Sequence, residues 1–271
     1  MVTAGTGAPA DLKSCCANLY QSDWARLLLG DSFHPGGLAL TERLGQLLRL
    51  SPDDRVLDVA AGRGTSAIHL AKTFGCRIVG VDFGAENVAA ASDAAATAGV
   101  ADRVTFRQGD AEWLSFDDKA FDAAICECAF CTFPEKKAAA AELARVLRPG
   151  GRVGLSDLVR QGELPRELEG LLAWAACIAD ARPVDDYVAF LVGAGFIWPR
   201  IDRHDSSLVA MVVDIRRKLL GAQILAGVGK LNMAGVDWAN ALVVARAAAD
   251  AVSRGKLGYA TIVAEKPIAI T

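Results

Sequence analysis

The sequence predicts a doubly wound, mostly parallel α/β sheet with helical additions at its N-terminal and C-terminal ends. Three observations predict this fold: short apolar runs alternate with helical patterns, glycines mark the turns between them, and acidic residues follow the ends of several runs. Strands joined by crossover helices form parallel sheets that helices cover on both faces. A chain of 271 residues, of which 52% are hydrophobic, can bury such a core.

Hydrophobic periodicity gives the order of the expected elements. Strands are expected over Arg55–Ala60, Arg77–Val81, Val104–Gln108, Phe121–Cys126, Arg152–Ser156, Phe196–Asp202 and Leu257–Glu265. Helices are expected over Leu38–Leu50, Thr65–Phe74, Ala85–Ala98, Lys136–Leu147, Leu208–Leu225 and Trp238–Ser253, with a mostly helical stretch between Gly162 and Gly193. Arg148–Gly151 is expected to be a turn. We expect an N-terminal thiol-bearing cap over 1–50, the core over 51–205, and a helical insertion with the final strand over 206–271.

Composition and charge exclude several classes of function. The net charge is −3 and the basic residues are scattered, so the chain offers no basic stripe for nucleic acid. No apolar run reaches the roughly 20 residues of a membrane span, and the first residues do not resemble a secretion signal. Seven cysteines is an odd number, which favours free thiols over a disulfide framework. We therefore expect a soluble, cytoplasmic protein.

The turn after the first expected strand has the features of a ligand-binding turn. Gly62 and Gly64 allow the backbone to pass close to a ligand, and the next helix points its N-terminal amides at it. Asp82 ends the second strand, where a carboxylate accepts hydrogen bonds from two ribose hydroxyls. Ala67 stands where a nicotinamide enzyme usually has a third glycine, which disfavours that cofactor.

The third expected strand ends in a second acidic turn. There Asp110 and the backbone amide of Ala111 are placed to recognise the edge of an adenine ring. Any one of these acids alone fits a helix cap or a solvated loop equally well. Together, and in this order, they favour a nucleoside-containing ligand.

This set of motifs resembles the class I S-adenosylmethionine-dependent methyltransferases. The corresponding segments are Val56–Gly64, Gly80–Asp82, Gly109–Glu112 and Leu147–Gly151, and the resemblance covers residues 50–160. It implies a Rossmann-like methyltransferase fold with S-adenosylmethionine as the cofactor. The cofactor site that it implies is formed by Asp58, Ala60, Gly62, Gly64, Asp82, Phe83, Asp110, Ala111 and Glu127.

A cluster of thiols follows the fourth expected strand. The carboxyl ends of parallel strands open onto the ligand crevice, so Cys128 is expected near the methyl group of the donor. Alternation turns Cys126 to the same side, but we interpret Cys126 as a core residue. Free cysteines are most often small buried hydrophobes, which is our interpretation of Cys76. The role of Cys131 stays open.

The cysteines narrow the resemblance to the arsenite methyltransferases. That family has a segment leading to cysteine near its N-terminus, similar to Asp11–Cys16, a cysteine after strand four, similar to Cys128, and a third in the helical region after strand five, similar to Cys177. The resemblance implies a thiolate site for trivalent arsenic as substrate, formed by Cys128, Cys177 and Cys15 or Cys16, because soft ligands match a soft metalloid. Transfer would follow from positioning without a general base, and a thiol reductant would be a partner.

Some features depart from that family and leave the acceptor open. Glu127 stands where the family carries a neutral amide, the Phe33–Gly37 loop replaces the expected segment, and the helical pair over 208–254 has no family motif. A small organic, thiol or selenol acceptor fits as well, and so does a non-catalytic thiol protein that binds a metalloid. Among the histidines, His34 lies in a loop that suggests function, whereas His69 is expected to be structural. The sequence leaves the oligomeric state open.

Overall fold

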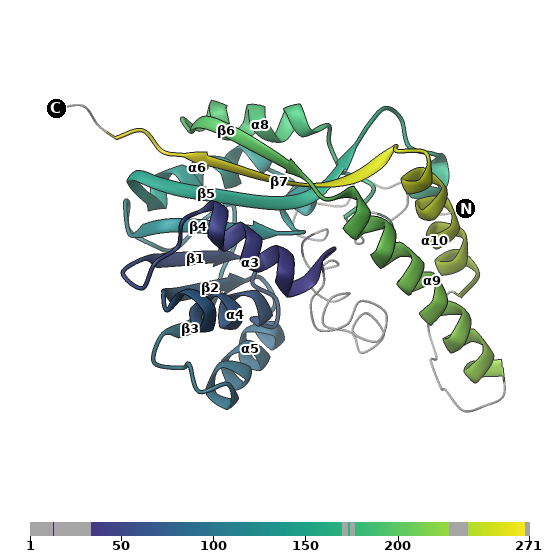
Figure 1. Cartoon of the computed structure of the whole chain (residues 1–271), viewed down its shortest axis with the longest axis horizontal. Helices are drawn as coiled ribbons and strands as arrows, with labels where there is room; N and C mark the ends of the chain where they lie inside the picture. Colours follow the sequence, from purple (N-terminus) through teal and green to yellow (C-terminus); the bar gives the residue numbers. More distant parts are fainter. Residues whose placement is uncertain (1–12, 14–33, 170–172, 174–176, 228–237, 269–271) are drawn as a thin grey trace.

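The computed structural model describes residues 13, 34–169, 173, 177–227 and 238–268. Within these residues a seven-stranded sheet has the order β3-β2-β1-β4-β5-β7-β6 (Figure 1). Neighbours from β3 to β5 pair in parallel, whereas β7 runs antiparallel between β5 and β6. The strands are β1 Arg55–Val59, β2 Arg77–Asp82, β3 Val104–Gln108, β4 Phe121–Glu127, β5 Leu147–Arg160, β6 Ile197–Arg203 and β7 Leu257–Glu265. The fold class predicted from the sequence is confirmed.

The helices also follow the predicted order. They are α3 Gly37–Leu47, α4 Thr65–Phe74, α5 Ala85–Thr97, α6 Lys136–Val146, α8 Val184–Gly193, α9 Asp205–Gly227 and α10 Trp238–Ser253, with short 3₁₀ turns η1 Phe130–Thr132 and η2 Arg166–Leu168. The bounds predicted for α4, β3, α10 and β7 agree with the structure, and most others differ by one to three residues. None of the described helices is both long and apolar enough to cross a membrane.

The turn predicted over 148–151 is wrong, because those residues belong to β5. Leu147 pairs with Phe121, the register then shifts, and Arg152 pairs with Ala123. The Pro-Gly-Gly segment forms this irregularity, and the amide of Lys266 donates to the carbonyl of Gly151. A partner from the far end of the chain therefore keeps the segment extended, which local sequence cannot reveal.

Side chains of the central strands alternate between two layers. Val56 and Ile78 pack with Leu44 of α3 in one cluster, whereas Leu57 packs with Leu143 of α6 in the other. Helices α3, α4 and α5 thus cover one face, and α6 and α8 cover the opposite face. Strands buried on both faces explain the near-continuous apolar runs in the sequence.

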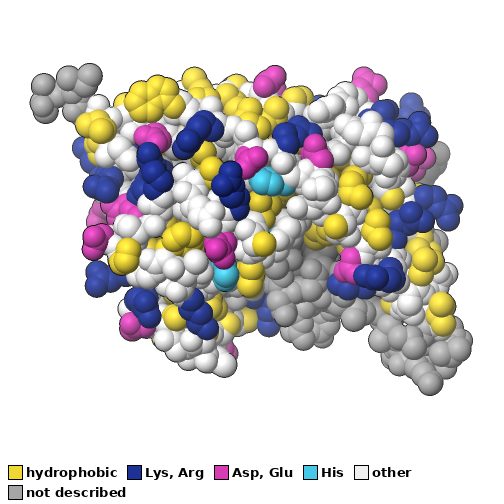
Figure 2. Space-filling model, in the orientation of Figure 1, with side chains coloured by type: hydrophobic (Ala, Val, Ile, Leu, Met, Phe, Trp, Pro, Cys, Tyr) yellow, Lys and Arg dark blue, Asp and Glu magenta, His cyan; other side chains and the backbone are white. Residues whose placement is uncertain are grey.

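Helices α9 and α10 pack against each other beyond one end of the sheet (Figure 1). Over the described part of the face in Figure 2, acidic and basic side chains are interspersed without a continuous basic stripe.

A buried carboxylate joins four elements at the carboxyl end of the sheet. Glu127 ends β4, and its Oε2 accepts hydrogen bonds from the hydroxyls of Thr41 in α3 at 2.9 Å and Ser66 in α4 at 2.6 Å. Its Oε1 accepts one from Ser156 in β5 at 3.3 Å. The side chain of Glu127 is only 4% exposed. A buried charge requires such donors, so this contact fixes α3 and α4 against the ends of β4 and β5.

We expect Thr41→Val to lower the free energy of unfolding by about 1.5–3 kcal/mol, because it removes a donor to a buried carboxylate at nearly constant volume. Thr261→Val is the matched control. Thr261 is equally buried, and its hydroxyl has no hydrogen-bond partner among the described residues, so Val there should be neutral or stabilising. Urea unfolding of both variants measures the difference. Equal losses of stability would contradict a special role for the Glu127 contact.

Candidate active site

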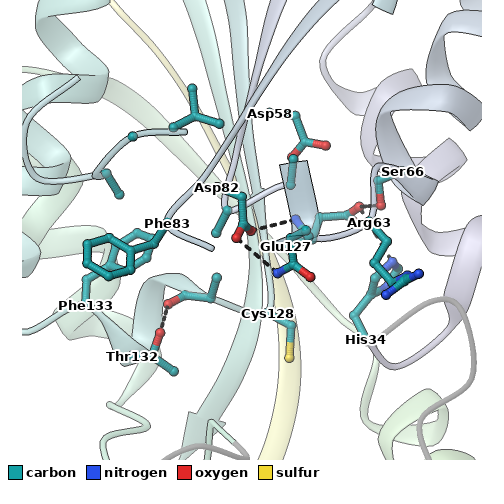
Figure 3. A pocket seen from close by; sticks show the side chains of 18 of the residues that line it. His34, Asp58, Arg63, Ser66, Asp82, Phe83, Glu127, Cys128, Thr132 and Phe133 are labelled. Carbon is teal, nitrogen blue, oxygen red and sulfur yellow. Dashed lines mark hydrogen bonds and ion pairs between the residues drawn. The ribbon is translucent and has the colours of Figure 1, made fainter. Parts of the chain in front are cut away.

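A pocket opens where the carboxyl ends of β1, β2, β3 and β4 meet, and Figure 3 shows it from close by. Most residues predicted for the cofactor site line it: Asp58, Ala60, Gly62, Asp82, Phe83, Asp110, Ala111 and Glu127. Gly64 lies just beside them as the N-cap of α4. The structure therefore brings together residues that are spread from Asp58 to Glu127 in the sequence.

The glycine turn after β1 has the backbone that the sequence predicts. Ala60, Gly62 and Gly64 all adopt positive φ angles, of 59°, 53° and 79°. A side chain at Gly64 would also clash with the ring of Phe106, whereas a Cβ at Gly62 would meet nothing within 4 Å. Gly64 is thus required by packing, while Gly62 leaves open space over which a ligand can approach the backbone.

Asp82 is held firmly at the end of β2. Its Oδ2 accepts the amide of Gly62 at 2.8 Å, and its Oδ1 accepts the amide of Gly84 at 2.8 Å and the side chain of Asn87 at 3.0 Å (Figure 3). A carboxylate has about four acceptor positions. One is left on Oδ2, and Asp82 lines the pocket.

Asp110 is positioned by its own turn and by a residue that sequence reasoning missed. Its Oδ1 accepts the amide of Glu112 at 2.9 Å, and its Oδ2 accepts the Lys13 ammonium at 2.7 Å. Lys13 also pairs with Glu112. Burial opposes the charge on Lys13, but its bonds to the two acids outweigh burial and raise its pKa. No local motif marks Lys13, because its partners lie 97 and 99 residues away.

The floor of the pocket is acidic. Asp58 in β1 is buried, and its Oδ2 has no hydrogen-bond partner among the described residues. Burial, followed by the charges of Glu127 and Asp82, raises the pKa of Asp58 well above its usual value. A pocket with these acids at its floor suits a ligand that carries positive charge or hydrogen-bond donors.

His34, which the sequence singled out because of its loop, lies beside Glu127. Its Nε2 is 3.2 Å from the hydroxyl of Thr41 and 3.6 Å from Oε2 of Glu127, and its Nδ1 is 3.2 Å from the carbonyl oxygen of Pro35. Both ring nitrogens therefore face protein groups. This geometry suits a side chain that positions Glu127. His69, which lies on α4 near Glu42, is not among the residues that line the pocket.

Cys128 and Cys177 meet at the edge of the pocket, although 49 residues separate them. The thiol of Cys177 donates to the carbonyl oxygen of Cys128 at 3.0 Å. The amide of Cys128 in turn donates to the carbonyl of Ser156 at 2.6 Å. Both cysteines adopt left-handed backbone angles, with φ of 53° and 63°. Such angles cost about 1–2 kcal/mol per residue outside glycine, so the surrounding contacts must hold them in place.

A third ligand-type group completes the thiol pair, namely the buried carboxyl of Asp157 in β5. One oxygen of Asp157 and the sulfurs of Cys128 and Cys177 all lie within 4.8 Å of one another. Burial, followed by the neighbouring Cys177, raises the pKa of Asp157 to about 7. The pKa of Cys128 is raised well above its usual value, first by the hydrogen bond between the two thiols and then by burial.

The other cysteines divide as the sequence suggested. Cys76 and Cys126 are buried in the core, and none of the described cysteines forms a disulfide. Burial raises the pKa of Cys76 to about 11. Cys131 is also buried, and its amide donates to Asp157 at 2.8 Å. Cys15 and Cys16, predicted as ligands, lie outside the described residues.

Sequence comparisons identify methyltransferase relatives. Residues 56–151 match the family described as methyltransferase domain. Methyltransferase GfsG of Streptomyces halstedii is 30% identical over 66% of this chain and 65% of its own length. A 27-O-demethylrifamycin SV methyltransferase of Amycolatopsis mediterranei is 33% identical over 58% of each chain. An arsenite methyltransferase of Halobacterium salinarum is 33% identical over 58% of this chain and 41% of its own length. The chain thus spans less than two thirds of each relative.

Solved structures share the whole architecture. A phosphoethanolamine N-methyltransferase 2 of Haemonchus contortus in complex with S-adenosyl-L-methionine has a TM-score of 0.77 at 18% identity, over 97% of this chain and 61% of that one. A geranyl diphosphate C-methyltransferase of Streptomyces coelicolor in complex with S-adenosyl-L-homocysteine has a TM-score of 0.73 at 17% identity, over 96% and 100%. Residues 56–151 thus form a methyltransferase domain, the chain has the fold of class I S-adenosylmethionine-dependent methyltransferases, and these matches support S-adenosylmethionine as the cofactor.

Proposed function

We propose that this protein transfers the methyl group of S-adenosylmethionine to trivalent arsenic held by Cys128 and Cys177. The observation that carries the proposal is the meeting of these two thiols beside the cofactor pocket, with Cys128 in its lining. The resemblance to arsenite methyltransferases had implied both as ligands on sequence grounds alone. Two thiols close together supply the soft ligands that trivalent arsenic prefers.

The pocket residues fit the cofactor along the order of the strands. Asp82 at the end of β2 has a free acceptor position for a ribose hydroxyl, and Asp110 with Ala111 after β3 would contact the adenine. The unpartnered oxygen of Asp58 and the carboxylate of Glu127 lie at the ends of β1 and β4, where they would receive the methionine ammonium. When bound, the cofactor supplies an electrophilic methyl group on a positively charged sulfur.

The thiols would hold the acceptor through exchange with arsenite. Each As–S bond forms as an As–O bond breaks, and the thiol proton leaves with the hydroxide as water, so thiols with raised pKa values need no separate base. In the transfer, the arsenic lone pair forms the As–C bond. The electron pair of the breaking S–C bond stays on the donor sulfur. Arsenic thereby becomes pentavalent, and a small-molecule thiol that is oxidised to its disulfide returns it to the trivalent state.

The second candidate is a methyltransferase for a small organic, thiol or selenol acceptor. It is favoured by the relatives GfsG and the 27-O-demethylrifamycin SV methyltransferase, and by Glu127 at a position where arsenite methyltransferases carry a neutral amide. A third candidate is a non-catalytic protein that binds a metalloid through its thiols. Mass spectrometry of the products from arsenite, labelled cofactor and a thiol reductant separates the three. Methylated arsenic supports the first candidate, and arsenic binding without turnover supports the third. If neither methylation nor binding is found, the second candidate is favoured.

Asp82→Ala should weaken binding of S-adenosylmethionine by about 1–3 kcal/mol while the fold stays intact, because it removes a charge-assisted acceptor at the ribose position. Calorimetric titration measures the loss. Asp102→Ala, at an exposed aspartate of which 72% of the side chain is accessible, is the control and should bind normally. Unchanged affinity in a folded Asp82 variant would remove this residue from the cofactor site.

Cys128→Ser and Cys177→Ser should each abolish arsenite methylation with little change in cofactor affinity, because a hydroxyl is a harder and far less acidic ligand than a thiol. Cys76→Ser should instead affect mainly stability, since Cys76 is fully buried in the core. The double variant Cys15→Ser/Cys16→Ser tests the third thiolate that the resemblance implies, and with the two-thiol site proposed here it should still methylate arsenite. Wild-type methylation by the Cys128 variant would rule out the thiolate mechanism.

A further inference from the structure

The thiol pair has a third, fixed neighbour whose role in the acceptor site has not been assigned. Asp157 accepts the amide of Cys131 on Oδ2 and the amide of Leu158 on Oδ1, both at 2.8 Å. These two backbone bonds fix the orientation of the carboxyl group, which is only 1% exposed. The side chain of Cys131 also hydrogen-bonds to this carboxyl group, so one of its about four acceptor positions stays open. One of these oxygens forms a triangle with the sulfurs of Cys128 and Cys177, with all three sides at most 4.8 Å.

Such a triangle matches the base of a pyramidal trivalent centre. Trivalent arsenic carries three substituents and a lone pair at the opposite apex. When Cys128 and Cys177 replace two hydroxyls, two waters leave and one original substituent stays on arsenic. In the triangle that substituent falls on the side of Asp157. For arsenite it is a hydroxyl, whereas for methylarsonous acid, which already carries one methyl group, it is the methyl.

The two substituents have opposite consequences beside a buried carboxyl group. A hydroxyl can hydrogen-bond to the open acceptor position of Asp157. A methyl group offers no hydrogen and keeps water away, so the polar oxygen is left unsatisfied. The unsatisfied oxygen weakens binding of the acceptor that has already been methylated, because Asp157 is fixed by its backbone bonds and cannot rotate away.

Building on the proposed function, we propose that Asp157 selects trivalent arsenic that retains a hydroxyl group. The protein then methylates arsenite once, and the monomethylated product is a poor second substrate. Asp157, at the third corner of the site, provides this specificity, and Cys128 and Cys177 form the other two corners.

The test measures binding before turnover. The full chain, kept reduced with a phosphine, is titrated separately with arsenite and with methylarsonous acid, and the near-ultraviolet absorbance of arsenic–thiolate bonds gives the two dissociation constants. Wild-type protein should bind arsenite about tenfold more tightly, the size of one buried hydrogen bond. Asp157→Ala should lose this preference, whereas Asp102→Ala, at an exposed and distant aspartate, should keep it.

The outcomes separate this inference from the proposed function. Equal affinities in the wild type, absence of binding by both arsenicals, or a preference that survives in a folded Asp157→Ala variant would overturn the inference. Turnover is then followed with each arsenical as the acceptor. Equal rates of methylation would confirm arsenic as the acceptor but overturn selection by Asp157. The expected binding preference without any methylated product would instead rule out arsenic methylation and leave the assignment of Asp157 standing.

Discussion

The site depends on one buried carboxylate, that of Glu127. Its hydroxyl partners come from α3, α4 and β5, and the residue itself ends β4. Removal of a carboxylate from water costs several kcal/mol unless donors surround it, so these elements can pack here only in the arrangement that brings the donors together. The next residue, Cys128, leaves the strand with a left-handed backbone. The contacts of Glu127 therefore stabilise the floor of the pocket and also fix the position of the acceptor thiol of Cys128.

The order of the strands spreads the chemistry along one edge of the sheet. Asp110 follows β3, Asp82 ends β2, Asp58 lies in β1, and the thiols lie beyond β4 next to β5. In open α/β sheets, ligands bind outside the carboxyl ends of the strands, so this order runs from the adenine end of the cofactor to the acceptor. The antiparallel strand β7 pairs with β5 beyond Ser156, as far as Arg160. This pairing holds Asp157 within a regular strand beside the thiols.

Much of the fold and of the cofactor site could be predicted from the sequence. Doubly buried parallel strands give unbroken apolar runs, and residues such as Asp82 and Asp110 directly follow those runs. The rest depends on contacts between distant segments. In the sequence, Thr41 and Ser66 are ordinary polar helix residues, and only the fold brings Glu127 to both hydroxyls. Likewise, Lys13 is distant from Asp110 in the sequence but donates to it in the structure. Cys177 could be singled out only by resemblance, and Asp157 carries no local signal because the two thiols beside it come from distant parts of the chain.

The most direct test of the account is a crystal structure of the full chain with S-adenosylhomocysteine and arsenite, measured at the arsenic absorption edge. We expect one strong anomalous peak at bonding distance from the sulfurs of Cys128 and Cys177, beside the nucleoside in the pocket that Asp82 and Asp110 line. A peak on other cysteines, or an ordered nucleoside with no arsenic at this thiol pair, would contradict it.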